Sequence, residues 1–199
     1  MTRVVSQNDF GIVCQALDNH KVVAFPTETV FGVGVKFNDI EALDALMEAK
    51  NRDYSKAITL MVYDKNDIEK YAYVNDSAKK IIDHFMPGMI TLVLNKKECV
   101  DPMMTNGKDT IGIRIPDCQY VLELLKRAGP MLVTSANLSN HVNTTTTSQV
   151  LEQLGGRIEL VVDGKTFDNI ASSVIDVTSE DIKILRECKI IEEDIRRIL

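Results

Sequence analysis

The sequence predicts an α/β fold, in which a twisted, mostly mixed or antiparallel sheet is flanked by helices. Short apolar runs of strand length alternate with amphipathic segments of helical period along the whole chain. No internal repeat and no low-complexity linker divides the 199 residues. We therefore expect a single domain, residues 1–199, which is long enough to bury a substantial core.

The strands are predicted from apolar runs that are bounded by turn residues. Pro26 ends the first of them, because proline removes a donor from the hydrogen-bond ladder. Pro130 precedes the strand 131–133. The predicted strands cover residues 22–26, 57–63, 90–94, 111–115, 131–133, 158–163, 172–177 and 182–186.

The helices are predicted from apolar residues that recur on one face. Asp39 is expected to cap a helix that carries Leu43 and Leu46 on its buried face. Asp117 is expected to cap another helix, and Pro87-Gly88 to stop the one before it. The predicted helices cover residues 40–47, 78–85, 118–125, 147–154 and 192–198.

The most informative segment is residues 25–34, Phe-Pro-Thr-Glu-Thr-Val-Phe-Gly-Val-Gly. A buried strand leads directly into two hydroxyls and a carboxylate. Gly32 and Gly34 then allow the backbone to approach a ligand or to adopt a positive φ. Open α/β sheets build ligand sites at strand ends, so this segment predicts a binding site. The alternative is a plain strand followed by a turn.

Two further segments carry positive charge. Lys50, Arg52 and Lys56 follow the first predicted helix, where three cations could clamp a polyphosphate. Cations are also favoured at helix C-termini by the helix dipole, so a purely structural role stays open. Arg114 lies inside an apolar strand and needs an anion, either a partner carboxylate or a substrate.

The last two polar segments are almost uncharged. Residues 134–139 follow a strand and offer hydroxyls and one amide, which suit either a polar ligand or a turn with helix-cap chemistry. Ser172 and Ser173 open a strand, and Arg186 ends the next one.

Composition argues against several classes of protein. The net charge of −6 is unusual for a protein that coats nucleic acid. The four cysteines and three histidines lack metal-type spacing, so we expect reduced thiols and no metal site built from side chains alone. No P-loop, Gly-x-Gly-x-x-Gly or Gly-x-Ser-x-Gly motif occurs. Without a signal segment or a membrane-length apolar stretch, we expect a soluble, cytoplasmic protein with no membrane contact.

Taken in order, these segments resemble the YrdC-like family of L-threonylcarbamoyladenylate synthases. The run 26–34 is similar to the family signature Pro-Thr-Glu-Thr-x-Tyr/Phe-Gly-Leu/Val-Gly. The similarity extends over nearly the whole chain, and the resemblance implies an α/β fold with a large open cavity. The other matching segments are Lys50-x-Arg52 with Lys56, Pro87 to Leu94, Ile113 to Pro116, Ser135 to Ser139 and Ser172 to Asp176.

The resemblance implies that L-threonine, bicarbonate and ATP give threonylcarbamoyl-AMP and pyrophosphate, for N6-threonylcarbamoyladenosine in tRNA. It implies Mg²⁺ held mainly by the ATP phosphates, a downstream threonylcarbamoyl-transferase complex as a partner and, more weakly, contact with tRNA. It would place Lys50, Arg52 and Lys56 as catalytic residues at the phosphates. The implied threonine ligands are Thr29, Arg114 (to the carboxylate), Ser135 and Ser172; the other implied ATP ligands are Thr110, Asn137, Thr145 and Arg186.

The sequence departs from the family pattern at several positions. Met61 stands where many relatives carry histidine, Asn140 and His141 replace Gly-Lys/Gln, and Cys188 alters the usual Arg-x-Gly. Three alternatives therefore stay open: an RNA-binding module of the same fold, a relative that makes carbamoyl-adenylate from carbamoyl phosphate, and a non-catalytic regulator.

Overall fold

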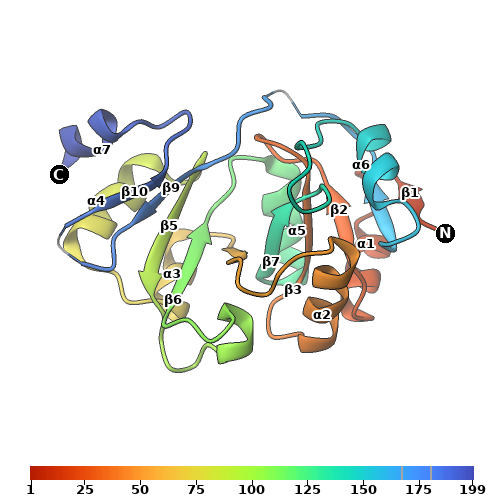
Figure 1. Ribbon diagram of the computed structural model, residues 1–199, viewed down its shortest axis with the longest axis horizontal. Helices are drawn as coiled ribbons and strands as arrows, with labels where there is room; N and C mark the ends of the chain where they lie inside the picture. The colour runs from red at the N-terminus through yellow and green to blue at the C-terminus, as the bar shows by residue number, and fades with distance from the viewer. Residues whose placement is uncertain (167, 180) are drawn as a thin grey trace.

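A mixed sheet forms the centre of the molecule in the computed structural model, which describes residues 1–166, 168–179 and 181–199 (Figure 1). The strand order is β1-β8-β2-β3-β7-β4-β6-β5-β9-β10. The strands are β1 (Arg3–Val5), β2 (Val23–Phe25), β3 (Gly32–Lys36), β4 (Thr59–Met61), β5 (Ile90–Asn95), β6 (Thr110–Arg114), β7 (Met131–Ser135), β8 (Leu160–Val162), β9 (Ser173–Asp176) and β10 (Lys183–Arg186).

Both parallel and antiparallel pairs occur, as the sequence predicts. Strand β4 runs parallel to β6 and antiparallel to β7, and β5 runs parallel to β9 and antiparallel to β6. The helices are α1 (Phe10–Asp18), α2 (Ile40–Ala49), α3 (Lys65–Tyr71), α4 (Asp76–Phe85), the short 3₁₀ helix η1 (Pro102–Thr105), α5 (Gln119–Ala128), α6 (Thr147–Leu154) and α7 (Glu192–Ile198).

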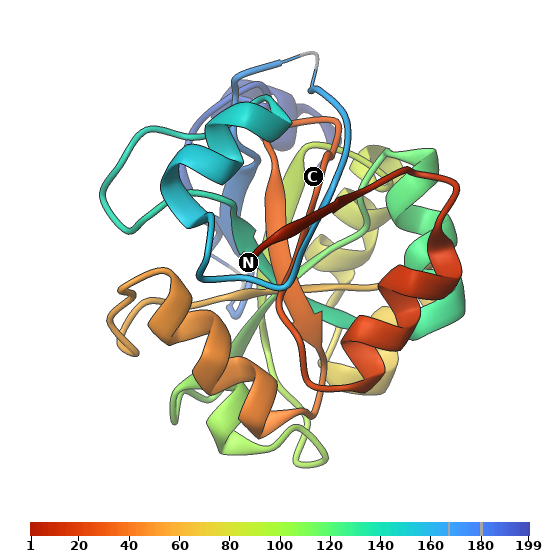
Figure 2. The ribbon, with the colours of Figure 1, turned by 90° about the vertical axis from the view of Figure 1, so that its right-hand side faces the viewer.

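Side chains of strand β2 alternate between two buried clusters, because successive residues of a strand point to opposite faces. Ala24 belongs to the larger cluster, which includes residues of α2, α4 and α6. Val23 and Phe25 belong to the other, with residues of α1 and α5. These two helices lie side by side in Figure 2. The sheet therefore has helices on both faces.

The main difference from the sequence prediction lies at Gly32 and Gly34, which we expected to approach a ligand or to adopt a positive φ but which belong to strand β3 and have no positive φ. A Cβ on Gly34 would lie 2.8 Å from the carbonyl oxygen of Leu132, a distance that real Cβ atoms do not show. Gly34 is thus required by the close approach of strand β7. The sequence also missed β1, α1 and α3, and it predicted 57–63 and 158–163 longer than β4 and β8.

One predicted helix cap is confirmed and one is wrong. The Asp39 carboxylate accepts a hydrogen bond of 3.0 Å from the backbone N–H of Ala42. Asp117 does not cap α5, whose N-cap residue is Cys118. Instead, the backbone N–H of Asp117 donates to Glu28 at 2.9 Å, so this turn is tied to the segment after β2. Among the described residues, we find no helix of the length and apolar character needed to cross a membrane.

Candidate functional site

A cavity of about 480 Å³ lies along one face of the central strands. Its floor follows the period of two: Met61 of β4, Gly112 and Arg114 of β6, and Thr91 and Val93 of β5 line it. The intervening residues Leu60, Ile113 and Leu92 belong to the core on the other face. At these strands the sheet thus presents one face to the larger core cluster and the other, which carries both polar and apolar side chains, to the cavity.

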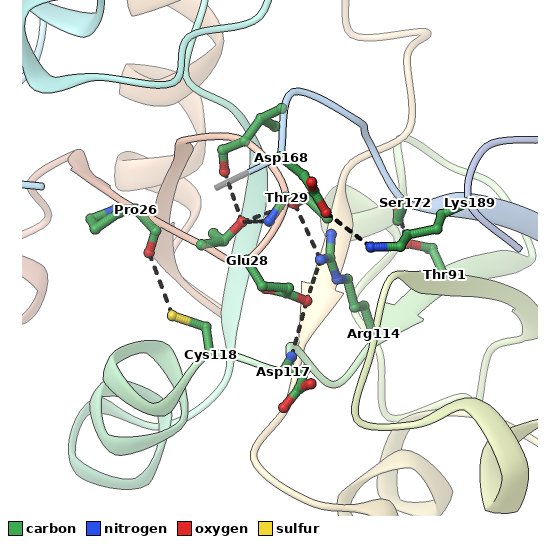
Figure 3. A network of polar contacts seen from close by, with 12 residues as sticks. Pro26, Glu28, Thr29, Thr91, Arg114, Asp117, Cys118, Asp168, Ser172 and Lys189 are labelled. Atoms are coloured by element: carbon green, nitrogen blue, oxygen red, sulfur yellow. Dashed lines mark hydrogen bonds and ion pairs between the residues drawn. The ribbon is translucent and has the colours of Figure 1, made fainter. Parts of the chain in front are cut away.

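Arg114 lines this cavity and contacts Glu28 and Thr29 (Figure 3). Its Nη2 donates to Glu28 Oε1 at 2.5 Å and to Thr29 Oγ1 at 3.2 Å. The Arg114 side chain is 6% exposed and that of Glu28 15%. Of the two anions that the sequence analysis allowed for Arg114, a partner carboxylate is present, and it belongs to Glu28. Within residues 1–166, 168–179 and 181–199, Arg114 Nε and Glu28 Oε2 are buried without a hydrogen-bond partner, so the pair does not satisfy all of its own polar atoms.

The turn that carries Glu28 and Thr29 is fixed by hydrogen bonds from Thr27. The Thr27 hydroxyl donates to the carbonyl of Val30 at 2.7 Å and accepts from the backbone N–H of Thr29 at 3.1 Å. It also lies 2.9 Å from Thr29 Oγ1. Such side-chain bonds to nearby backbone atoms hold the turn in one conformation.

A second cluster of hydroxyls lies on the β5–β9 side of the cavity. Thr91 Oγ1 and Ser172 Oγ are 2.9 Å apart, as Figure 3 shows. The Arg186 guanidinium donates to the carbonyl of Ser172 at 2.9 Å and to its hydroxyl at 3.2 Å. All three residues line the cavity. The chain turn at Cys188 is also tied here, since its backbone N–H donates to Ser173 Oγ at 3.1 Å.

Lys50 and Arg52 have different environments although they are two residues apart. Lys50 is 1% exposed, and its ammonium donates to the carbonyl of Ser135 at 2.5 Å and to that of Asn137. Burial first, and then the charges of Arg52 and Lys56, lower the pKa of Lys50 to about 7. Contact between Lys50 and a phosphate would require it to leave these carbonyls.

Arg52 lines the cavity, and its Nη2 donates to the carbonyl of Ala57 at 2.8 Å. Burial lowers the pKa of its guanidinium, and its Nε is buried with no hydrogen-bond partner among the described residues. Lys56 lies outside the described lining residues and donates to Asn140 Oδ1 at 2.8 Å. Asn140, which differs from the family pattern, therefore binds directly to Lys56, a residue that we predicted to contact the phosphates.

Two predicted nucleotide ligands also lie outside the described lining of the cavity. The Asn137 amide donates to the carbonyls of Leu138 and His141, whereas its Oδ1 is buried with no partner in the part of the chain that the structure describes. The Thr145 hydroxyl donates to Gln149 at 3.1 Å. The structure thus brings seven of the predicted site residues to one cavity: Thr29, Arg52, Thr110, Arg114, Ser135, Ser172 and Arg186.

Positive charge dominates this cavity although the chain as a whole carries −6. Its described charged lining residues are Arg52, Lys108, Arg114, Arg186 and a single carboxylate, Asp176. Sequence reasoning gave no role to Lys108, Thr91 or Asp176. The period-two pattern of β5 and β9 could have placed Thr91 and Asp176 on one face, but no local signal marks Lys108.

The fold and the cavity define the class of the protein: an α/β domain whose mixed sheet forms the floor of a cation-lined cavity. Residues 15–188 match the Sua5/YciO/YrdC family, which is described by the words "Telomere recombination". The chain belongs to this family, and the resemblance expected from the motifs is confirmed.

Several relatives give this membership more detail. The chain is 38% identical over 85% of its length to a Methanocaldococcus jannaschii protein, of which it covers 80% and whose name provisionally states threonylcarbamoyl-AMP synthase. It is 33% identical to the threonylcarbamoyl-AMP synthase of Bacillus subtilis over 100% of its length, covering 59% of that protein. Thus it spans little more than half of some longer relatives.

The solved structures agree in fold. The crystal structure of Pyrococcus abyssi Sua5 complexed with L-threonine superimposes with a TM-score of 0.94 at 30% identity, covering 100% of this chain and 61% of that one. The structure of Escherichia coli YciO gives a TM-score of 0.88 at 22% identity, covering 98% of this chain and 100% of that one. The YrdC-like α/β fold is therefore confirmed.

Proposed function

We propose that residues 1–199 act as one YrdC-like domain with threonylcarbamoyl-AMP synthase activity. The observation that carries this proposal is the cavity itself, where Arg114 is held by Glu28 and Thr29 while Arg52 and Arg186 line the same space. Relatives that carry this activity in their names, at 33–38% identity, support it. So does the Sua5 structure that contains L-threonine.

The reaction suits a site that positions anions. The threonine ammonium and bicarbonate give a carbamate, with release of water and one proton. A carbamate oxygen then forms a bond to the α-phosphorus of ATP, the bond from that phosphorus to the bridging oxygen breaks, and pyrophosphate leaves with the electron pair. No protein nucleophile is needed, so positioning and charge neutralisation are what the protein contributes.

We propose that threonine binds to the Arg114 guanidinium and to the hydroxyl groups around it. The Arg114 guanidinium would bind the threonine carboxylate, because guanidinium and carboxylate form charge-assisted hydrogen bonds. Ser172 would face the amino acid from the opposite side, with Thr29 and Ser135 completing the set. Ser135 also connects this set to Lys50 through its carbonyl.

The phosphates of ATP are assigned to Arg52, Lys56 and Arg186. Arg52 and Arg186 already line the cavity, and Lys56 would be directed by Asn140. Thr110, Asn137 and Thr145 would contact the nucleotide. Lys50 would act through the loop 135–139, since its ammonium binds two carbonyls there and its own carbonyl accepts from the backbone N–H of Ser139 at 3.0 Å.

Mg²⁺ is part of this proposal as a cation held mainly by the ATP phosphates, whose oxygens it prefers. When bound, it would neutralise charge on the phosphates. Transfer of the product to tRNA by a threonylcarbamoyl-transferase complex, and a cytoplasmic location, belong to the same proposal.

Pyrophosphate release with ATP and bicarbonate, with and without L-threonine, tests the activity, with the adenylate confirmed by mass. We expect release that depends on threonine. Arg114→Ala should raise KM mainly for threonine and Lys56→Ala mainly for ATP, whereas the exposed control Arg196→Ala should change neither. Release that is independent of threonine, or equal small effects of the two site variants, would contradict these assignments.

A further inference from the structure

Lys56 belongs to a group of cations that are held by neutral oxygen atoms. Its ammonium donates to Asn140 Oδ1 at 2.8 Å. Arg52 and Lys108 each donate to a backbone carbonyl within residues 55–57, at 2.8 Å and 3.0 Å. A neutral acceptor leaves the net charge of a cation in place, whereas the carboxylate of an ion pair cancels it. This edge of the cavity therefore keeps its positive charge for a ligand.

The charge of Lys56 is not cancelled by a carboxylate. None of the ion pairs in the described part of the chain includes Lys56. The carboxylate of Asp53, three residues earlier, accepts from the backbone N–H of Ser55 at 2.7 Å. Burial, followed by the charges of Arg52 and Lys56, lowers the pKa of Lys50 to about 7, so the charge of Lys56 acts on its surroundings.

The backbone of Lys56 is anchored by a different loop, the one between η1 and β6. Asn106 Nδ2 donates to the carbonyl of Lys56 at 3.2 Å. Asn140 holds the far end of the Lys56 side chain from the loop after β7. Both of the loops that this last bond joins reach the cavity, since Ala57 and Asn143 line it. Lys56 is thus fixed at both ends beside the cavity.

We propose that Asn140 is a positioning residue, which holds the Lys56 ammonium at the edge of the cavity without cancelling its charge. An ammonium has three N–H donors. Asn140 takes up one of them, and the other two remain for the oxygens of a polyphosphate. A long side chain that is already held in place loses less entropy when a ligand binds. This inference rests on the proposed synthase activity, in which Lys56 binds the ATP phosphates, and deepens it.

Asn140→Gly removes the acceptor without straining the backbone. Asn140 has a φ of 67°, which glycine adopts readily, and the family pattern also has glycine at this position. Asn38→Gly is the matched control. Asn38 has a φ of 63° and lies outside the described lining of the cavity, so the same change is made there in the same backbone conformation.

The dissociation constant of ATP with Mg²⁺, measured by titration calorimetry, tests the inference. We expect Asn140→Gly to weaken ATP binding by about three- to tenfold, which is what ordering one long side chain costs. In a Lys56→Met background the same change should have no effect, because Asn140 acts through Lys56. Asn140→Asp should weaken ATP binding more than Asn140→Gly, since a carboxylate cancels the charge of Lys56 and repels phosphate. Asn38→Gly should bind ATP like the wild type, and KM for threonine should stay unchanged in the Asn140 variants.

The outcomes separate the two proposals. Wild-type protein that binds ATP but releases no pyrophosphate with threonine would contradict the synthase activity and leave the comparison at Asn140 intact. Unchanged or tighter ATP binding by Asn140→Gly would overturn the further inference alone. An equal effect of Asn140→Gly with and without Lys56 would also overturn it, as would wild-type affinity in Asn140→Asp. Wild-type protein that does not bind ATP would overturn both proposals.

Discussion

Removing the charge of Glu28 should weaken both the fold and the binding of the amino acid. Glu28 Oε1 accepts from Arg114 at 2.5 Å and from the backbone N–H of Asp117 at 2.9 Å, and the Arg114 side chain is only 6% exposed. In Glu28→Gln the amide oxygen can still accept these bonds. The guanidinium, however, is left without a counter-charge in a largely buried position.

The magnitude follows from this burial. Breaking a buried ion pair by removing one partner costs about 3–5 kcal/mol, and the retained hydrogen bonds place Glu28→Gln near the lower end, about 3 kcal/mol. With a urea m-value of about 2–3 kcal/mol/M, the unfolding midpoint should fall by about 1–1.5 M. Glu123→Gln is the matched control, because Glu123 pairs with Arg127 on the exposed surface of α5. Its effect should stay within about 1 kcal/mol.

Urea unfolding and steady-state kinetics measure the two effects separately. Misplacement of Arg114 should raise KM for threonine more than KM for ATP. If Glu28→Gln unfolds at the same urea concentration as Glu123→Gln and keeps the wild-type KM for threonine, then Glu28 neither stabilises nor positions Arg114.

Two further predictions concern the scaffold of the cavity. Gly34→Ala should lower the free energy of unfolding by about 1–3 kcal/mol, because its Cβ would meet the Leu132 carbonyl at 2.8 Å, whereas Gly11→Ala, with no atom within 4 Å, is the control; equal stability of the two variants in urea would contradict this. Lys50 has a pKa of about 7 in the folded protein against 10.5 as its ordinary value, so the unfolded chain binds more protons between these pH values and Lys50 makes stability rise with pH there. Measured from pH 7 to 9.5, this rise should be smaller in Lys50→Met, and an identical pH dependence of the two proteins would show that folding does not lower the pKa of Lys50.

Much of the fold could be predicted from local patterns. The strands that line the cavity have continuous or alternating apolar residues, and Asp39 caps α2 with a bond to a residue three positions away. Strand β1 could not be predicted in this way, because its three residues are paired with β8, and Arg3 lies opposite Leu160. Nothing in the sequence of either segment indicates that the two segments pair.

Gly32 and Gly34 show a different limit. Glycine is compatible with a turn, a ligand contact or a close approach of two strands, and the sequence does not distinguish among them. In the structure, Gly34 serves the close approach of two strands, because strand β7 leaves no room for a side chain there. Gly32 combines two of these roles, since it also lines the cavity.

The cations after α2 show why residue type does not fix a role within a site. Lys50 and Arg52 belong to one cluster in the sequence, yet Lys50 points to the carbonyls of the loop after β7 while Arg52 lines the cavity. Lys50 is the C-cap residue of α2, and the next residue, Asn51, has a φ of 47°. The backbone therefore leaves the helical path between Lys50 and Arg52, and the two side chains reach different partners. Lys50 anchors the loop that carries Ser135 and Asn137, and Arg52, which we propose as a phosphate ligand, faces the cavity.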